Sequence, residues 1–218
     1  MSEETTTGPV ARSPIRPPAP VRVVDGWECS AISSTAALTL TDVTPLAKVS
    51  IKASVKASGP APAGGGTEQA VGVPFRRARR GDDGALVVGS GPGEWLVLGR
   101  TGSAGRLIEH WRRATAGSGE PVTVLDLTHG RALMRLTGER AADALSTVCG
   151  IDLRDAATPD GAAFRSSVAG LVTDVVRDDV STRPSYLLHC ERSSGQYLFD
   201  ALLQAGAAYD VGIAGFAG

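Results

Sequence analysis

The sequence predicts an α+β fold made of two tandem ferredoxin-like halves, which are split βαβ units with antiparallel sheets and helices on one face. Two observations lead to this prediction. The expected elements follow nearly the same order in both halves of the chain, and the first long strand carries a polar face of the kind that antiparallel sheets tolerate. The composition agrees with a folded domain, because 42% of the 218 residues are hydrophobic and 21% are charged.

The chain begins with a proline-rich stretch that has no apolar periodicity. Proline removes a backbone donor, and little here could offset the entropy lost on ordering. We therefore expect residues 1–24 to form a disordered arm, followed by a first α+β half at 25–127 and a second at 128–218. The stretch at 57–66, rich in Gly, Ala and Pro, is expected to be a flexible loop inside the first half.

The first half contains a strictly alternating segment at 46–56. Val49 and Ile51 are expected to face the core, whereas Lys48 and Lys52 are expected to form a cationic outer face. The other predicted elements of this half are a short helix at 68–71, strands at 94–98 and 122–127, and an amphipathic helix at 103–115.

The second half repeats the pattern after a turn at His129–Gly130. Thr137 is expected to be the N-cap of a helix that buries Ala141, Leu145 and Cys149. The other predicted elements are strands at 132–137, 168–176 and 185–191, a polar turn at 178–184, a helix from 193 or 194 to 206 that buries Tyr197 and Leu198, and a short strand at 209–213.

Charge and cysteine content exclude several classes of protein. Lys and Arg number 22 against 23 Asp and Glu, so the net charge of −1 favours neither nucleic acid nor an anionic membrane as a partner. No stretch approaches the roughly 18 apolar residues that a membrane-spanning helix needs. Three scattered cysteines exclude a disulfide scaffold and indicate a reducing compartment, the cytoplasm.

His129 is the residue most suggestive of chemistry, since histidine titrates near neutrality and this one follows Asp126 and Thr128 in a turn. A general base is one interpretation. The alternative, which we favour, is a structural histidine that bonds to Asp126 or Thr128. In a strand, His189 and Cys190 face opposite sides and cannot act jointly.

The remaining polar motifs also favour structural roles. Gly89–Gly93 lacks the lysine of a phosphate-binding loop and is read as a hairpin connection. The basic cluster Arg76–Arg80 is read as a solvated loop or docking rim, with nucleic-acid binding as the alternative. Cys149 fits a buried helix face, Cys29 has no recognisable partner, and the acidic residues between Asp152 and Asp179 match no metal motif. We therefore assign no catalytic residue and no metal ligand, and leave any cofactor-binding residues open.

One stretch, VLDLTHGRALMRLTGERAADALSTVCGIDL at 124–153, resembles the gamma subunit of heterotetrameric sarcosine oxidase. The resemblance continues through 162–179 and 185–205, and upstream it includes GPGEWLVL at 91–98. That family is similar in fold to the folate-binding part of the glycine-cleavage aminomethyltransferase. The resemblance implies an accessory, non-catalytic chain in a cytoplasmic complex with alpha, beta and delta subunits.

Such complexes demethylate sarcosine oxidatively to glycine, with release of hydrogen peroxide and of formaldehyde or 5,10-methylenetetrahydrofolate. The resemblance places FAD, FMN, NAD and tetrahydrofolate in the partner subunits and none of them in this chain. The alternative is a stand-alone folate-binding or aminomethyltransferase-like module, to which Asp126, His129 or Trp95 could contribute.

Overall fold

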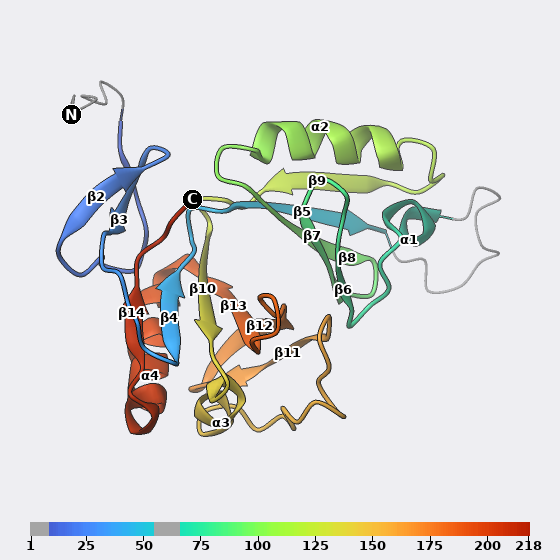
Figure 1. Ribbon diagram of the computed structural model, residues 1–218. Helices are drawn as coiled ribbons and strands as arrows, with labels where there is room; N and C mark the ends of the chain where they lie inside the picture. The colour runs from blue at the N-terminus through green and yellow to red at the C-terminus, as the bar shows by residue number, and fades with distance from the viewer. Residues whose placement is uncertain (1–8, 55–65) are drawn as a thin grey trace.

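The computed structural model describes residues 9–54 and 66–218, which fold into four main layers (Figure 1). Two sheets pack face to face, and helices cover the outer face of each. Helices α1 (Gly66–Val71) and α2 (Ala104–Thr115) cover one sheet, and α3 (Ala141–Ser146) and α4 (Gly195–Gly206) cover the other. The short 3₁₀ helices η1 (Arg192–Ser194) and η2 (Ala207–Tyr209) flank α4.

The described strands form three sheets. The small N-terminal sheet contains β1 (Ala11–Arg12), β2 (Val21–Val24) and β3 (Trp27–Ser30) in the order β1-β3-β2. The five-stranded sheet contains β5 (Ala47–Ala53), β6 (Ala78–Arg80), β7 (Leu86–Gly91), β8 (Glu94–Gly99) and β9 (Val122–Asp126) in the order β6-β7-β8-β5-β9. The six-stranded sheet contains β4 (Thr39–Asp42), β10 (Arg131–Thr137), β11 (Ala163–Val168), β12 (Leu171–Arg177), β13 (Ser185–Glu191) and β14 (Gly212–Ala214) in the order β11-β12-β13-β10-β4-β14.

Most neighbouring strands are antiparallel, and only β1–β3 and β4–β14 pair in parallel among the paired strands described. The predicted α+β class with antiparallel-rich sheets is therefore confirmed. Strand β4, which lies within the predicted first half, joins the six-stranded sheet between β10 and β14. The two large sheets thus do not divide cleanly at residue 127.

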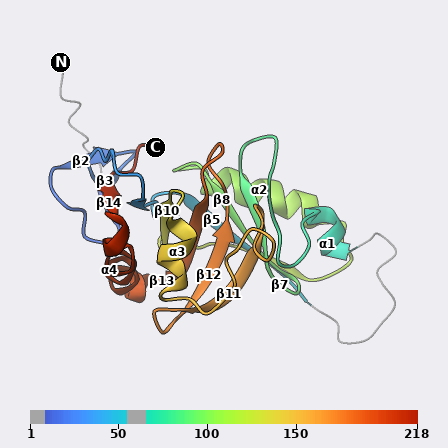
Figure 2. The ribbon, with the colours of Figure 1, turned by 60° about the horizontal axis from the view of Figure 1, so that its bottom comes forward.

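The helices bury the apolar stripes that their sequences predict. Leu107 and Trp111 of α2 pack on Val49 and Ile51 of the five-stranded sheet. In Figure 2, α3 and α4 lie side by side against the six-stranded sheet. Tyr197 departs from the prediction, since 58% of this α4 residue is exposed, whereas Leu198 is fully buried.

Strand β5 is buried on both faces, which corrects the predicted cationic outer face. Lys48 and Ser50 lie within the packing of the two sheets, and Lys48 has no exposed surface. Within β5, Lys52 is the one exposed residue, and it forms an ion pair with Glu94. The alternating pattern identified the strand correctly, but it could not reveal that a second sheet covers its polar face.

Three other predictions need correction. Residues 9–24 are not a disordered arm, because they form β1 and β2 and bury Ile15, which is 1% exposed; residues 1–8 lie outside the described part. The strand predicted at 168–176 is confirmed as β12 from Leu171 onward, but its first residues are wrong, because Ala169 and Gly170 have left-handed φ and form the turn that joins β12 to β11. Thr137 belongs to β10, and α3 is preceded by Arg140 in the N-cap position. The loop predicted at 57–66 falls almost entirely outside the described residues.

Gly138 joins β10 to α3 in a conformation that only glycine adopts readily, with φ of +146°. A Cβ at this position would collide with the backbone carbonyl of Ala37, while the Gly138 N–H donates to the carbonyl of Pro184 at 2.9 Å. We expect Gly138→Ala to lower the free energy of unfolding by about 2–3 kcal/mol, because both strain and overpacking must be accommodated.

Urea denaturation measures this effect, and Gly105→Ala is the matched control. Gly105 lies inside α2, and no atom lies within 4 Å of the place that an added methyl group would occupy. The control should therefore be stabilising by about 0.5–1 kcal/mol, because alanine is the better helix former. Equal stability changes in the two variants would contradict the tight approach of Ala37 to Gly138.

Candidate functional site

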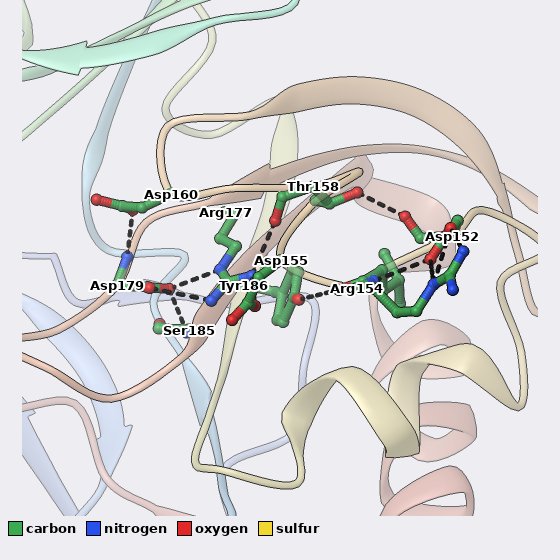
Figure 3. A network of polar contacts seen from close by, with 10 residues as sticks. Asp152, Arg154, Asp155, Thr158, Asp160, Arg177, Asp179, Ser185 and Tyr186 are labelled. Carbon is green, nitrogen blue, oxygen red and sulfur yellow. Dashed lines mark hydrogen bonds and ion pairs between the residues drawn. The ribbon is translucent and has the colours of Figure 1, made fainter.

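Arg177, at the end of β12, is the centre of a buried polar network (Figure 3). Only 5% of this residue is exposed, and its guanidinium donates to Asp179 at 3.0 Å, to Asp155, and to the Thr158 carbonyl at 2.8 Å. Burial opposes the charged form, but the hydrogen bonds from the guanidinium to Asp179 and Asp155 outweigh it and raise the pKa of Arg177. Arg177 thus holds the loop between α3 and β11 against the turn that follows β12.

Asp178 connects the two large sheets. Its carboxylate, 7% exposed, accepts hydrogen bonds from Arg80 of β6 at 2.6 Å and from Arg135 of β10 at 2.5 Å. Its neighbour Asp179 accepts from the Ser185 N–H at 3.0 Å, within the polar turn predicted at 178–184. Arg80, expected in a solvated loop, therefore has a structural ion pair that fastens the edge of one sheet to the other.

Lys48 lies in a second buried polar group, where β4 passes into β5. Its ammonium donates to the carbonyls of Thr44 at 2.6 Å and Leu46 at 2.8 Å. Burial lowers the pKa of Lys48 from its ordinary value of 10.5 to about 7, against the opposing charges of Asp42 and Asp126. Both donor bonds go to backbone carbonyls, so this amine serves the turn between the strands.

His129 is exposed and stacks on the indole ring of Trp27, with ring centroids 4.8 Å apart and planes 9° from parallel. The predicted bond from its side chain to Asp126 or Thr128 does not form; instead, Asp126 accepts from the Thr128 N–H at 2.8 Å. The carbonyl of His129 accepts from Arg192 at 3.3 Å. The turn is thus ordered by its neighbours, and the imidazole contacts the small N-terminal sheet.

His189 and Cys190 face opposite sides of β13, as predicted. His189 lies 3.5 Å from Asp174, and its Nε2 has no partner among the described residues. Burial lowers its pKa below the usual 6.5, so the ring is neutral near pH 7. Cys190 packs among apolar residues under α3 and α4, and burial raises its pKa to about 11.

The other two cysteines are also free and buried. Burial raises the pKa of Cys29 to about 11, with the Asp42 charge as the next cause. Cys149 lies in the apolar core, as predicted, but beyond the end of α3, where it forms a β-bridge with Val168. Buried thiols held in the protonated form are poor nucleophiles, so Cys29 and Cys190 do not provide an activated cysteine.

The glycine-rich stretch Gly89–Gly93 forms the hairpin between β7 and β8, as predicted. A side chain at Gly89 would collide with the backbone carbonyl of Pro74. This close approach brings the chain before β6 against β7: the Arg76 N–H donates to the Gly89 carbonyl at 2.9 Å. The carbonyl of Arg76 in turn accepts from the Ala163 N–H at 3.0 Å, so Arg76 connects the two large sheets.

A cavity of about 450 Å³ opens where these sheets meet, within the size range of ligand pockets. Arg76 and Arg77 line one side, and the loop at 151–159 lines the other. The network around Arg177 holds that loop in place through Asp155 and Thr158. The basic stretch that the sequence singled out thus borders a sizeable pocket, and Asp152 lines the same pocket.

Sequence reasoning missed the residues that organise this region, namely Arg177, Asp178 and Arg135. A usable signal existed, because an arginine that ends the apolar run Val175–Val176 and precedes two aspartates indicates a partly buried ion pair. Over residues 9–54 and 66–218, no group of three or more His, Cys, Asp or Glu is placed to hold a metal ion. In the same residues, no helix is long and apolar enough to cross a bilayer.

Comparisons with known proteins agree with this architecture. A family model described as the GCVT N-terminal domain matches residues 81–218. A chain of the heterotetrameric sarcosine oxidase from Corynebacterium sp. U-96 is similar in structure, with a TM-score of 0.64 and 23% identity over 83% of this chain and 89% of that chain. The glycine cleavage system aminomethyltransferase T from Bartonella henselae has a TM-score of 0.64 and 14% identity over 89% of this chain.

The match covers 55% of the aminomethyltransferase, so the chain spans about half the length of that protein. No protein of curated function matches the sequence significantly. The resemblance inferred from the sequence motifs is thereby confirmed, since both types of protein that it named share this fold.

Proposed function

This chain belongs to the GCVT N-terminal domain family, and on that premise we propose that it is the accessory gamma subunit of a heterotetrameric sarcosine oxidase. In this role it supports the oxidative demethylation of sarcosine to glycine, with release of hydrogen peroxide and of formaldehyde or 5,10-methylenetetrahydrofolate. Its partners are alpha, beta and delta subunits in the cytoplasm. Those partners hold FAD, FMN, NAD and tetrahydrofolate, and this chain itself is not catalytic.

The observation that carries the proposal is the extent of the structural match, which covers most of this chain and most of the sarcosine oxidase chain. The buried groups support an accessory role. Lys48 is bonded to backbone carbonyls, Arg177 and Asp178 hold loops and sheets together, and burial keeps Cys29 and Cys190 protonated. These side chains therefore have structural roles in place of chemical ones.

A stand-alone folate-binding or aminomethyltransferase-like module is the second candidate, favoured by the family model. The three residues suggested for such a site do not converge on a pocket. Trp95 donates from its ring to the Val73 carbonyl at 2.7 Å beneath the helices, Asp126 accepts from Thr128, and His129 stacks on Trp27. This set does not fit a pterin and its glutamate tail, and we derive no transfer step from it.

We also propose that each large sheet is built on a ferredoxin-like unit, with 25–127 and 128–218 as the two halves. The strand order β7-β8-β5-β9 in the five-stranded sheet supports this assignment. The six-stranded sheet has the corresponding order β12-β13-β10-β14, with β4 between β10 and β14. Strands β6 and β11 are then additions at the sheet edges, and β4 is an insertion from the first half into the second sheet.

Co-purification tests the subunit role. The tagged chain is co-expressed with the candidate flavin-containing oxidase subunits of the same organism, and we expect these subunits to be retained with it through washing. Sarcosine-dependent release of hydrogen peroxide should require the assembled complex and should be lost when this chain is omitted. The purified chain alone, given sarcosine, is the control and should release none.

A chain that purifies alone, beside flavin subunits that are fully active without it, would contradict the subunit role. Calorimetric titration of the isolated chain with tetrahydrofolate separates the two candidates. We expect no heat of binding at about 1 mM ligand, where even weak sites begin to fill. Saturable heat would favour the folate module instead.

A further inference from the structure

The cavity beside Arg76 and Arg77 lies at the free edge of the six-stranded sheet. Strand β11 is the outermost strand of that sheet. Its outer edge is bridged at one end, where Arg77 meets Ala162, and at the other, where Cys149 meets Val168. The Ala163 N–H already donates to the Arg76 carbonyl, and between Ala163 and Val168 the outer edge of β11 pairs with no other strand of the described chain. An extended peptide can add to such an edge through main-chain hydrogen bonds.

The charge of this cavity is positive. The side chains of Arg76 and Arg77 are exposed and make no hydrogen bond or ion pair within the described residues. The carboxylate that also lines the cavity, Asp152, is already bonded to Arg154 at 2.9 and 3.0 Å from Nε (Figure 3). Two guanidinium groups are therefore available, and each matches the geometry of a carboxylate.

Apolar groups line the rest of the cavity. The wall formed by the loop after α3 includes Ile151, which is 40% exposed, with Ala156 and Pro159, and Phe164 of β11 adds an aromatic ring. A ligand that suits these walls alternates charged and apolar groups, as the side chains of a β-strand do. A nucleic acid suits them less well, because the lining residues include a single aromatic ring, that of Phe164, and no long basic track.

The backbone that carries the two arginines is also held in place by hydrogen bonds. Arg76 has a left-handed φ of 68°, a strained conformation for a non-glycine residue, and hydrogen bonds to Gly89 and Ala163 maintain it. The opposite wall is fixed by Arg177 through Asp155 and Thr158. Rigid walls reduce the entropy lost on binding, so the site is organised before its ligand arrives.

We propose that this cavity binds an extended acidic segment of a partner protein. Its carboxylates pair with Arg76 and Arg77, its apolar side chains contact Ile151 and Phe164, and its backbone lies along the unpaired edge of β11. The site belongs to the isolated chain, so it can be tested without any oxidase subunit. If no peptide binds here, the proposed subunit role is unaffected, and if the subunit role is wrong, this peptide site is unaffected.

Titration of the full ¹⁵N-labelled chain by NMR tests the proposal with defined peptides. The probe is acetyl-Val-Glu-Leu-Glu-Val-amide, and its neutral twin has Gln in place of Glu. We expect the acidic peptide to bind at least about tenfold more tightly than the twin and to shift the amides of Arg77 and Phe164. The double variant Arg76→Gln/Arg77→Gln should bind both peptides equally weakly.

Two further variants make the result specific. Arg112→Gln/Arg113→Gln removes the same charge from an exposed face of α2 and should leave peptide affinity unchanged. Arg76→Glu/Arg77→Glu should prefer the lysine peptide acetyl-Val-Lys-Leu-Lys-Val-amide, which a merely misfolded variant would not do. Equal binding of glutarate and the acidic peptide would overturn the proposal in favour of a small-molecule site. Absence of any shift at about 5 mM peptide would overturn it outright.

Discussion

Arg177→Met is expected to lower the free energy of unfolding by about 3–5 kcal/mol, as removal of one partner from a buried ion pair does. Methionine replaces the apolar stem but leaves the Thr158 carbonyl and the Asp179 carboxylate without their main donor. Asp155 adds little to this effect, because 87% of its side chain is exposed to water. The loss therefore comes from the buried side of the network.

Urea denaturation measures this loss, and Arg154→Met is its matched control. Arg154 also pairs with an aspartate of the same loop, but 85% of its side chain is exposed. We expect the control to change stability by less than about 0.5 kcal/mol. Hydrogen exchange should also rise in the loop at 150–162 for Arg177→Met alone. Similar stabilities for both variants would show that Arg177 does not hold the loop.

Lys48 is expected to make the protein more stable as the pH rises from 7 to 9. The pKa of Lys48 is about 7 in the folded chain and returns to its ordinary 10.5 on unfolding. In this interval the unfolded chain therefore binds one more proton than the folded chain, and the free energy of unfolding rises with pH. The slope is about 1.4 kcal/mol per pH unit, so the gain approaches 2–3 kcal/mol at pH 9.

The pH interval in which stability rises has a lower limit near pH 7 and an upper limit near pH 9. Below pH 7 Lys48 is charged in both states, so its contribution becomes constant and the cost of burying the charge is present in full. Above pH 9 the thiols of Cys29 and Cys190 ionise in the unfolded chain, while burial keeps their folded pKa near 11. The unfolded chain then binds fewer protons, and stability falls again.

Denaturation at several pH values between 7 and 9 tests this expectation. Lys48→Met removes the ammonium and should abolish the rise, so that stability increases by no more than about 0.5 kcal/mol between pH 7 and 9. Lys52→Met, on the same strand but with an exposed side chain, should retain the full slope. A wild-type protein whose stability is constant over this interval would contradict the burial of an uncharged Lys48.

Local patterns predicted the elements whose apolar residues face a single neighbour. The stripes of α2 and α4 follow the helical period, and the strands at 94–98 and 185–191 agree with β8 and β13 to within one residue. The hairpin at Gly89–Gly93 could be predicted because its turn residues are adjacent in the chain. The resemblance at 124–153 identified the family for the same reason, since it depends on a continuous stretch of sequence.

The environment of each polar side chain could not be predicted in this way. Asp178 and Arg80 are distant in the chain, and they meet only because two sheets pack face to face. Lys48 alternates with apolar residues just as an exposed lysine would, yet the second sheet covers it. The ordering of residues 9–24 likewise depends on contacts such as that of Ile15 with the core around α4.

Much of the secondary structure, the family and the hairpin at Gly89–Gly93 thus followed from short-range patterns, which report on one face of one element at a time. Long-range packing produces the ion pairs of Arg177 and Asp178 and the lowered pKa of Lys48. It also leaves the edge of β11 beside Arg76 exposed. Burial changes the free energy of a charged side chain by several kcal/mol. Whether a side chain is buried depends on the elements that pack against it, and a local sequence pattern does not contain that information.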